Sequence, residues 1–162
     1  MSTVTANGID IYYELWGEGP PLVMAHGFCG CTDEWRALVL PLAKRRCLLL
    51  YDVRGHGRSS APEDPALYSM PILAADQAAL MRALGIERAH VGGLSMGGWI
   101  AWSFALAYPE AVAGLILSDA AGYLGDKYIT LSPDVIAVGM DTQGQVEVEL
   151  DATLTALPGE RL

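Results

Sequence analysis

The stretch Val91-Gly92-Gly93-Leu94-Ser95-Met96-Gly97-Gly98 contains the pattern G-x-S-x-G, with Gly93, Ser95 and Gly97 in the fixed positions. Residues 88–91 before it predict a short strand, and residues 99–108 after it predict a helix that ends at Pro109. A serine between a strand and a helix takes a tight turn with unfavourable φ and ψ, so the residues two positions before and after it must be small. The stretch therefore predicts a strand–turn–helix unit with Ser95 at its apex.

Such a turn gives Ser95 a chemical environment as well as a shape. It holds the hydroxyl clear of the sheet and places the next backbone N–H at a helix N-terminus, where negative charge on an oxygen is stabilised. The alternative is a glycine-rich corner with an incidental serine, and the pattern alone leaves that alternative open. A nucleophile is indicated only if further signals accompany the motif.

Composition limits the classes of protein that this sequence can encode. The chain has 162 residues, 52% of them hydrophobic and 18% charged, which is typical of one globular domain or of part of a larger one. The net charge of -9 disfavours nucleic acid and anionic membranes as partners, since either would need a basic face. Residues 91–108 are uncharged, but the glycines and the turn at Ser95 favour a buried strand and helix over a membrane span.

The N-terminus and the cysteines bear on location and on metals. No basic segment followed by an apolar core occurs at the N-terminus, so we expect no signal peptide. Three cysteines, Cys29, Cys31 and Cys47, are an odd set that favours a reduced, cytoplasmic setting. Cys29 and Cys31 are too close together for half of a zinc site, and no second pair exists. We expect no metal and no cofactor.

Strand and helix patterns alternate along the chain. Asn7-Gly8 between two alternating runs predicts an antiparallel hairpin at the start. Apolar runs typical of buried parallel strands follow at 22–25, 47–51 and 114–118. Helical spacing occurs at 35–43 and 69–84. These patterns predict an α/β fold, with a mostly parallel sheet and helices on both faces.

The character of the chain changes near Gly125. Residues 126–162 hold seven acidic and two basic side chains, which is a net -5. Residues 145–154 alternate like a strand with one buried face. We interpret residues 123–162 as a divergent acidic tail of uncertain structure, after a domain portion at 1–122.

Three signals follow the ends of predicted parallel strands: His26-Gly27-Phe28, the run from Asp52 to Ser59, and the Ser95 turn. Ligands bind along that edge of open α/β sheets. Together these motifs resemble the N-terminal portion of the α/β-hydrolase superfamily, over residues 1 to about 122, and look most like its small serine esterase, enol-lactonase and haloperoxidase-like branch. A dinucleotide-binding fold ranks low because the glycines do not meet the spacing G-x-G-x-x-G.

The resemblance implies roles for particular residues. Ser95 matches the nucleophile, and the backbone N–H groups of Phe28 and Met96 match the oxyanion hole. Gly93 and Gly97 shape the turn. His26, Gly27, Asp52, Arg54 and His56 match positions that shape or brace the loops. The implied substrate is a small carboxylic ester or lactone, cleaved through an acyl-enzyme. Among the tryptophans, Trp35, Trp99 and Trp102 are candidates for an acyl pocket, but we expect Trp99 and Trp102 in the core.

The family pattern is incomplete in this sequence. Family members place the acid and then a histidine after the nucleophile, yet no histidine follows Ser95 here. His90 begins the strand of Ser95 at its opposite end, and Asp119 is a minority candidate for the acid. We therefore expect the last strands and terminal helix to be missing and the chain to be a crippled hydrolase. Three explanations stay open: a fragment or frameshifted product, a noncatalytic relative that acts as a binding or scaffold module, or a partner chain that supplies the missing strands.

Overall fold

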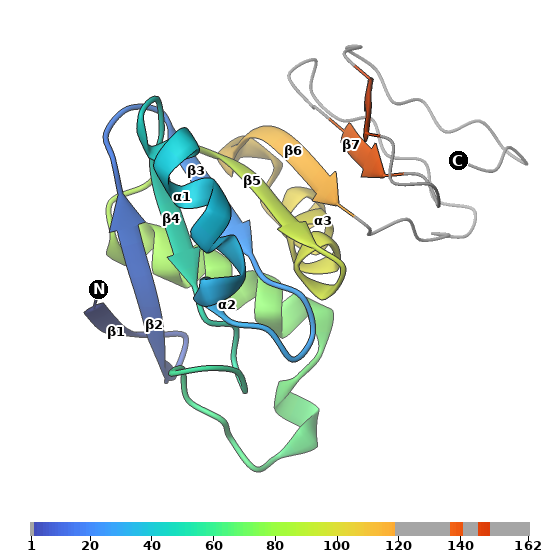
Figure 1. The fold of residues 1–162 in the computed structure, drawn as a ribbon. Helices are drawn as coiled ribbons and strands as arrows, with labels where there is room; N and C mark the ends of the chain where they lie inside the picture. Colours follow the sequence, from blue (N-terminus) through green and yellow to red (C-terminus); the bar gives the residue numbers. More distant parts are fainter. Residues whose placement is uncertain (1, 119–136, 141–145, 150–162) are drawn as a thin grey trace, which may run out of the picture.

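The computed structural model describes residues 2–118, 137–140 and 146–149. Six strands form one sheet in the order β1-β2-β4-β3-β5-β6 (Figure 1). Their bounds are β1 Ser2–Ala6, β2 Ile9–Trp16, β3 Pro21–Ala25, β4 Cys47–Tyr51, β5 Ala89–Leu94 and β6 Val112–Ser118. β3, β4, β5 and β6 run parallel to one another, whereas β2 pairs antiparallel with both β1 and β4. This confirms the predicted α/β fold with a mostly parallel sheet.

The hairpin between β1 and β2 turns at Asn7 and Gly8, as its sequence predicts. Both residues have positive φ, 48° and 76°, which is the conformation that a two-residue hairpin turn requires. The pairing of Ala6 with Ile9 closes the hairpin directly at this turn. The antiparallel start of the sheet therefore follows from two adjacent residues.

Helices cover both faces of the sheet. α1 Arg36–Ala43 lies on one face, and α2 Met70–Ala83 and α3 Met96–Ala107 lie on the other (Figure 1). Short 3-10 turns occur at Thr32–Trp35, Pro65–Leu67 and Pro109–Ala111. α1 begins one residue later than the spacing predicts, because a 3-10 turn occupies the residues up to Trp35. No helix in residues 2–118 is both long and apolar enough to cross a membrane.

Strand register explains the two cores. One row of side chains crosses the parallel strands from Leu49 through Val23 and Val91 to Leu115. These four side chains are fully buried and belong to the core beneath α2 and α3. Successive residues of a strand point to opposite faces. Leu22, Met24, Leu48 and Leu50 therefore pack on the opposite face, with Trp35 and Val39.

Parts of the C-terminal region are also described. β7 Ala137–Met140 pairs antiparallel with β8 Val146–Glu149. The strand expected from the alternation in residues 145–154 is present as β8. Asp119, the minority candidate for the acid, lies outside the described residues.

Candidate active site at the carboxyl edge of the sheet

Ser95 occupies a strained turn between β5 and α3. Its φ of 50° and ψ of -112° are unfavourable for a residue with a side chain. Backbone hydrogen bonds hold the turn: the Ser95 N–H donates to the Ser118 carbonyl at the end of β6, at 2.8 Å, and the Trp99 N–H donates to the Ser95 carbonyl at 3.1 Å. Ser95 is exposed, whereas both of its flanking elements are largely buried. The strand–turn–helix prediction is confirmed, with the helix beginning at Met96 rather than at Trp99.

The glycines at 93 and 97 fit the turn because a side chain at either position has no room. A Cβ on Gly93 would overlap backbone atoms of Gly97, and a Cβ on Gly97 would overlap the backbone carbonyl of Ala25. Neither glycine has positive φ, so close approach of backbone to backbone excludes larger residues here. The end of β3 at Ala25 thus packs directly against the backbone of the turn at Gly93 and Gly97.

The peptide group between Gly27 and Phe28 lies in the loop after β3, the strand that pairs with β5. Its carbonyl, on Gly27, accepts hydrogen bonds from the Gly30 N–H at 3.0 Å and from the His26 ring at 2.8 Å. The peptide is trans, so the N–H of Phe28 points away from that carbonyl. On the other side of the residue, the Gly27 N–H donates to the Glu34 carboxylate at 2.7 Å. Three bonds therefore fix the direction of the Phe28 N–H.

His26 is a fully buried histidine whose two nitrogens are both used. Its Nε2 accepts from the Val53 N–H at 2.9 Å, so the proton of the neutral ring lies on Nδ1 and is donated to Gly27. Burial lowers the pKa of His26, and the nearby His56 adds to this effect. The ring is thus held neutral.

A cavity of about 380 Å³ opens beside the Ser95 hydroxyl. It is lined by Phe28, Arg54, His56, Tyr68, Met70, Leu73, Ser95, Met96 and Trp99. Met96 is the first residue of α3, so its N–H has no partner within the helix. The cavity therefore brings Ser95, Phe28 and Met96, three of the predicted site residues, to one place.

The tryptophans divide between this cavity and the core. Trp99 lines the cavity, so the expectation that it lies in the core is wrong. The helix begins three residues earlier than predicted, and Trp99 consequently sits in its first turn, beside Ser95. Trp102, one turn further on, packs against the core under α2 and α3, and Trp35 is buried on the opposite face of the sheet.

None of the three histidines is bonded to Ser95. Within residues 2–118, no hydrogen bond joins the Ser95 hydroxyl to an imidazole. His26 is occupied by Gly27 and Val53, and the His90 ring lies 3.3 Å from a guanidinium nitrogen of Arg46. His56 lines the cavity and holds the Arg54 carbonyl at 3.1 Å. Across the described ranges, no group of three or more His, Cys, Asp or Glu side chains could hold a metal ion.

A family model described as alpha/beta hydrolase fold matches residues 20–147. The chain belongs to the α/β-hydrolase fold family. The match runs past residue 122, where the motif resemblance ends, and so includes β7 and the first two residues of β8. The matched range includes the turn at Ser95 and four of the six strands of the main sheet.

Individual relatives cover several chemistries. The protein named "Putative carbamate hydrolase RutD" of Azorhizobium caulinodans is 40% identical over 67% of this chain and 40% of its own length. An epoxide hydrolase of Vigna radiata has a TM-score of 0.73 at 28% identity, over 75% of this chain and 40% of its own. The enol-lactonase of Burkholderia xenovorans LB400 has a TM-score of 0.69 at 32% identity, over 72% and 46%. The chain spans about two fifths of the length of the curated relatives that it matches.

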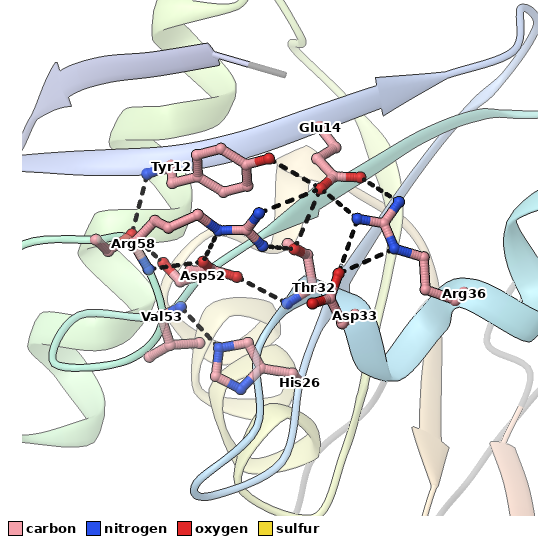
Figure 2. A network of polar contacts seen from close by, with 10 residues as sticks. Tyr12, Glu14, His26, Thr32, Asp33, Arg36, Asp52, Val53 and Arg58 are labelled. Atoms are coloured by element: carbon pink, nitrogen blue, oxygen red, sulfur yellow. Dashed lines mark hydrogen bonds and ion pairs between the residues drawn. The ribbon is translucent and has the colours of Figure 1, made fainter.

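In this hydrolase-fold chain, Asp52 ties the loops behind the site together (Figure 2). Its carboxylate accepts from the Thr32 N–H at 2.7 Å and from the Arg58 N–H and side chain at 2.8 and 3.1 Å. Burial alone would raise the pKa of Asp52, but these hydrogen bonds and the charge of Arg58 outweigh it and lower the pKa. Asp52 therefore stays ionised and joins the loop after β3 to the loop after β4.

Glu14 extends the same network, although no motif in the sequence singles it out. It is fully buried on β2 and accepts hydrogen bonds from Tyr12 and Arg36 at 3.0–3.1 Å (Figure 2). The Trp16 ring N–H also donates to the Glu14 carboxylate, at 2.9 Å. Burial would raise its pKa, but the bonds from Trp16 and Tyr12 and the charge of Arg36 lower it overall. The alternation of β2 places Glu14 on a defined face, but Arg36 and Thr32, which bond to its carboxylate, come from a distant part of the sequence.

Arg54 lines the cavity and forms an ion pair with Asp76 that was not predicted from the sequence. Its guanidinium bonds both carboxylate oxygens of Asp76 on α2, at 2.6 and 2.7 Å, and the backbone carbonyl of Asn7 at 3.2 Å. Arg54 and Asp76 are both nearly fully buried. One buried pair therefore joins the hairpin, the loop after β4 and the helix α2.

Proposed function

We propose that Ser95 is the nucleophile of a hydrolase that acts on a small carboxylic ester or lactone. The strained turn at Ser95 carries this proposal, because a structural serine has no need of an unfavourable φ of 50° supported by two glycines that cannot be replaced. The cavity of about 380 Å³ beside the hydroxyl supports a small substrate.

The proposed reaction passes through an acyl-enzyme. The Ser95 oxygen attacks the substrate carbonyl, the Ser95 proton leaves to a base, and the carbonyl oxygen becomes an anion. The N–H groups of Phe28 and Met96 stabilise that anion, and its collapse expels the alcohol, which takes a proton. Water then attacks the acyl group and releases the acid and the free serine.

The base is the part of this mechanism that the 162 residues do not supply in the family's order, because no histidine follows Ser95. We expect this chain by itself to turn over little or no ester, with a residual rate from the oxyanion hole and substrate binding. Asp119, which follows β6 directly in the sequence, stays the proposed acid. A partner chain that supplies further strands and the histidine belongs to the same proposal.

A noncatalytic binding or scaffold module is the rival function, favoured by the missing base. A fluorophosphonate probe separates the two. We expect stoichiometric labelling of the folded chain, located at Ser95 by peptide mass spectrometry and lost in Ser95→Ala. Folded protein that takes up no label would support the rival, as would labelling that survives in Ser95→Ala.

The setting proposed for this hydrolase is the cytoplasm. Cys29, Cys31 and Cys47 are free thiols, which supports a reducing compartment. The acidic net charge supports a small-molecule partner rather than a nucleic acid.

A further inference from the structure

His56 lies in the wall of the cavity next to the proposed oxyanion hole. Its ring is packed between the rings of His26 and Phe28, with centroids 5.2 and 5.7 Å away. The contact with Phe28 is edge to face, so His56 sits directly beside the residue whose N–H would stabilise the oxyanion. If the carbonyl of a substrate is bound in the proposed oxyanion hole, the substrate atoms next to that carbonyl would lie close to the His56 ring.

One nitrogen of His56 is committed to the protein and the other is not. Nδ1 lies 3.1 Å from the backbone carbonyl of Arg54, which can only accept, so the neutral ring keeps its proton on Nδ1. Nε2 then carries a lone pair. Within residues 2–118 that nitrogen has no hydrogen-bond partner. The ring therefore has one hydrogen-bond acceptor to offer a ligand.

The other polar side chains in the cavity wall are partly committed to the protein. Nε and Nη2 of Arg54 donate to Asp76 and Asn7, and its third nitrogen, Nη1, can donate but not accept. The hydroxyl of Tyr68 donates to the Pro62 carbonyl at 2.6 Å. Apart from the Ser95 hydroxyl, the remaining lining is apolar, from Phe28, Met70, Leu73, Met96 and Trp99. Among these described residues, His56 thus offers a ring nitrogen that can accept and has no partner, whereas Arg54 can only donate.

We propose that His56 is a specificity-determining residue whose Nε2 accepts a hydrogen bond from a hydroxyl or N–H group that the substrate carries close to its scissile carbonyl. This inference rests on the proposed function, since it takes the position of the carbonyl from Ser95, Phe28 and Met96. It narrows the substrate class from small esters in general to esters or lactones with such a donor, for example those of 2-hydroxy acids. A substrate that carries the donor should bind more tightly than one without it. Water leaves the cavity when the substrate binds, so without a donor the nitrogen would be left without a hydrogen bond.

The experiment compares two esters, in one of which a methyl group replaces the donated hydrogen, and variants at position 56 separate the hydrogen bond from the effect of that methyl group. Ser95→Ala allows binding to be measured without cleavage, by ligand-observed NMR on the full chain. Methyl 2-hydroxyhexanoate should bind about fivefold more tightly than methyl 2-methoxyhexanoate, which is the effect of one neutral hydrogen bond. Adding His56→Leu should abolish the preference, whereas adding His56→Gln, which keeps an acceptor oxygen, should retain it. Tyr68→Phe is the matched control: it removes an occupied hydroxyl from the same wall and should leave the preference unchanged.

Equal affinity for the two esters in the Ser95→Ala chain would overturn the inference, as would a preference that persists in the His56→Leu variant. If His56→Leu does not fold by circular dichroism, the 15N shift of His56 Nε2 in labelled Ser95→Ala protein gives the answer. The hydroxy ester should move it and the methoxy ester should not; equal shifts would contradict the inference. Failure of the proposed function is a separate result, namely a wild-type chain that fluorophosphonate does not label.

Discussion

Gly97 is the residue on which the geometry of Ser95 depends most directly. Its Cα faces the carbonyl of Ala25 so closely that a methyl group cannot fit, and α3 would have to shift to admit one. Gly97→Ala should therefore lower the rate of fluorophosphonate labelling about 100-fold, since a displacement of the nucleophile by about 1 Å has an effect of this order. Time courses of labelling measure the rate.

Gly85→Ala is the control for the labelling experiment. Gly85 also has a backbone that favours glycine, with φ of 69°, but a Cβ there meets nothing within 4 Å. This variant should lose some stability and label at the wild-type rate. If Gly97→Ala labels as fast as Gly85→Ala, the close approach at the turn does not control Ser95.

The buried pair of Arg54 and Asp76 should matter far more for stability than a surface pair. Asp76→Asn leaves a buried guanidinium without its counter-charge and should lower the free energy of unfolding by about 3–5 kcal/mol. Asp33→Asn removes a carboxylate with a 61% exposed side chain, paired with Arg36, and should cost less than about 1 kcal/mol. Urea unfolding of both variants measures the difference, and equal losses would contradict a structural role for the buried pair.

The neutrality of His26 predicts a dependence of stability on pH. Its pKa in the folded chain is lower than its ordinary value of 6.5, so below pH 6.5 the unfolded chain binds a proton that the folded chain does not. Stability should therefore fall as the pH decreases from 6.5 towards the folded pKa. The pKa values of the Asp52 and Glu14 carboxylates are also lowered in the folded chain. Their contributions to the stability of the fold should be lost only at lower pH, below about pH 4.

Denaturant unfolding at pH 5.0, 5.5, 6.0 and 6.5 tests this dependence. The wild-type chain should lose stability over this window more steeply than His26→Asn, which cannot titrate there. Parallel curves for the two proteins would mean that His26 does not stay neutral in the folded chain.

Residue roles were predictable from the sequence where local geometry decides them. The need for small residues at 93 and 97 follows from a serine placed between a strand and a helix, and the contacts with Ala25 and Gly97 agree with it. Asp76 could not be predicted as a partner of Arg54, because the two lie on different elements and meet only when the chain folds. Nor could the sequence predict that Nε2 of His56 has no partner within residues 2–118, because this depends on the loop conformation that places Nδ1 against the Arg54 carbonyl.

At the scale of elements, periodicity was sufficient to locate strands and helices but not to fix their ends. The run from Val91 to Tyr108 contains one strand and one helix, as its glycines indicated. The helix nevertheless starts at Met96, because the residues after the nucleophile are already helical. This difference of three residues is enough to move Trp99 from the core to the cavity.

Helix α3 offers a direct test of which of its faces supports the fold. Ile100 is fully buried against the sheet, and Leu106 on the same helix is 50% exposed. Ile100→Ala should lower the free energy of unfolding by about 2–5 kcal/mol, because it leaves a cavity in the core. Leu106→Ala should change it by about 0.5 kcal/mol or less. Urea unfolding measures both, and similar losses would mean that α3 is packed differently.

At the scale of the whole molecule, the site exists because three strands end at one edge of the sheet. β3 leads to the loop of Gly27 and Phe28, β4 to the loop of Asp52 and Arg54, and β5 to Ser95. This convergence was predictable, since parallel strands bring their carboxyl ends together. The size and apolar lining of the cavity were not, because they depend on side chains from several elements, such as Tyr68, Met70 and Leu73.

We propose that the Ser95 hydroxyl is poised for attack and lacks only a base among these 162 residues. The most direct test is the hydrolysis of p-nitrophenyl acetate by the full chain as imidazole is added to the solution. Imidazole can take the proton of Ser95, so it should raise the wild-type rate well above that of Ser95→Ala, which corrects for hydrolysis by imidazole alone. An identical imidazole dependence in the two proteins would contradict the claim.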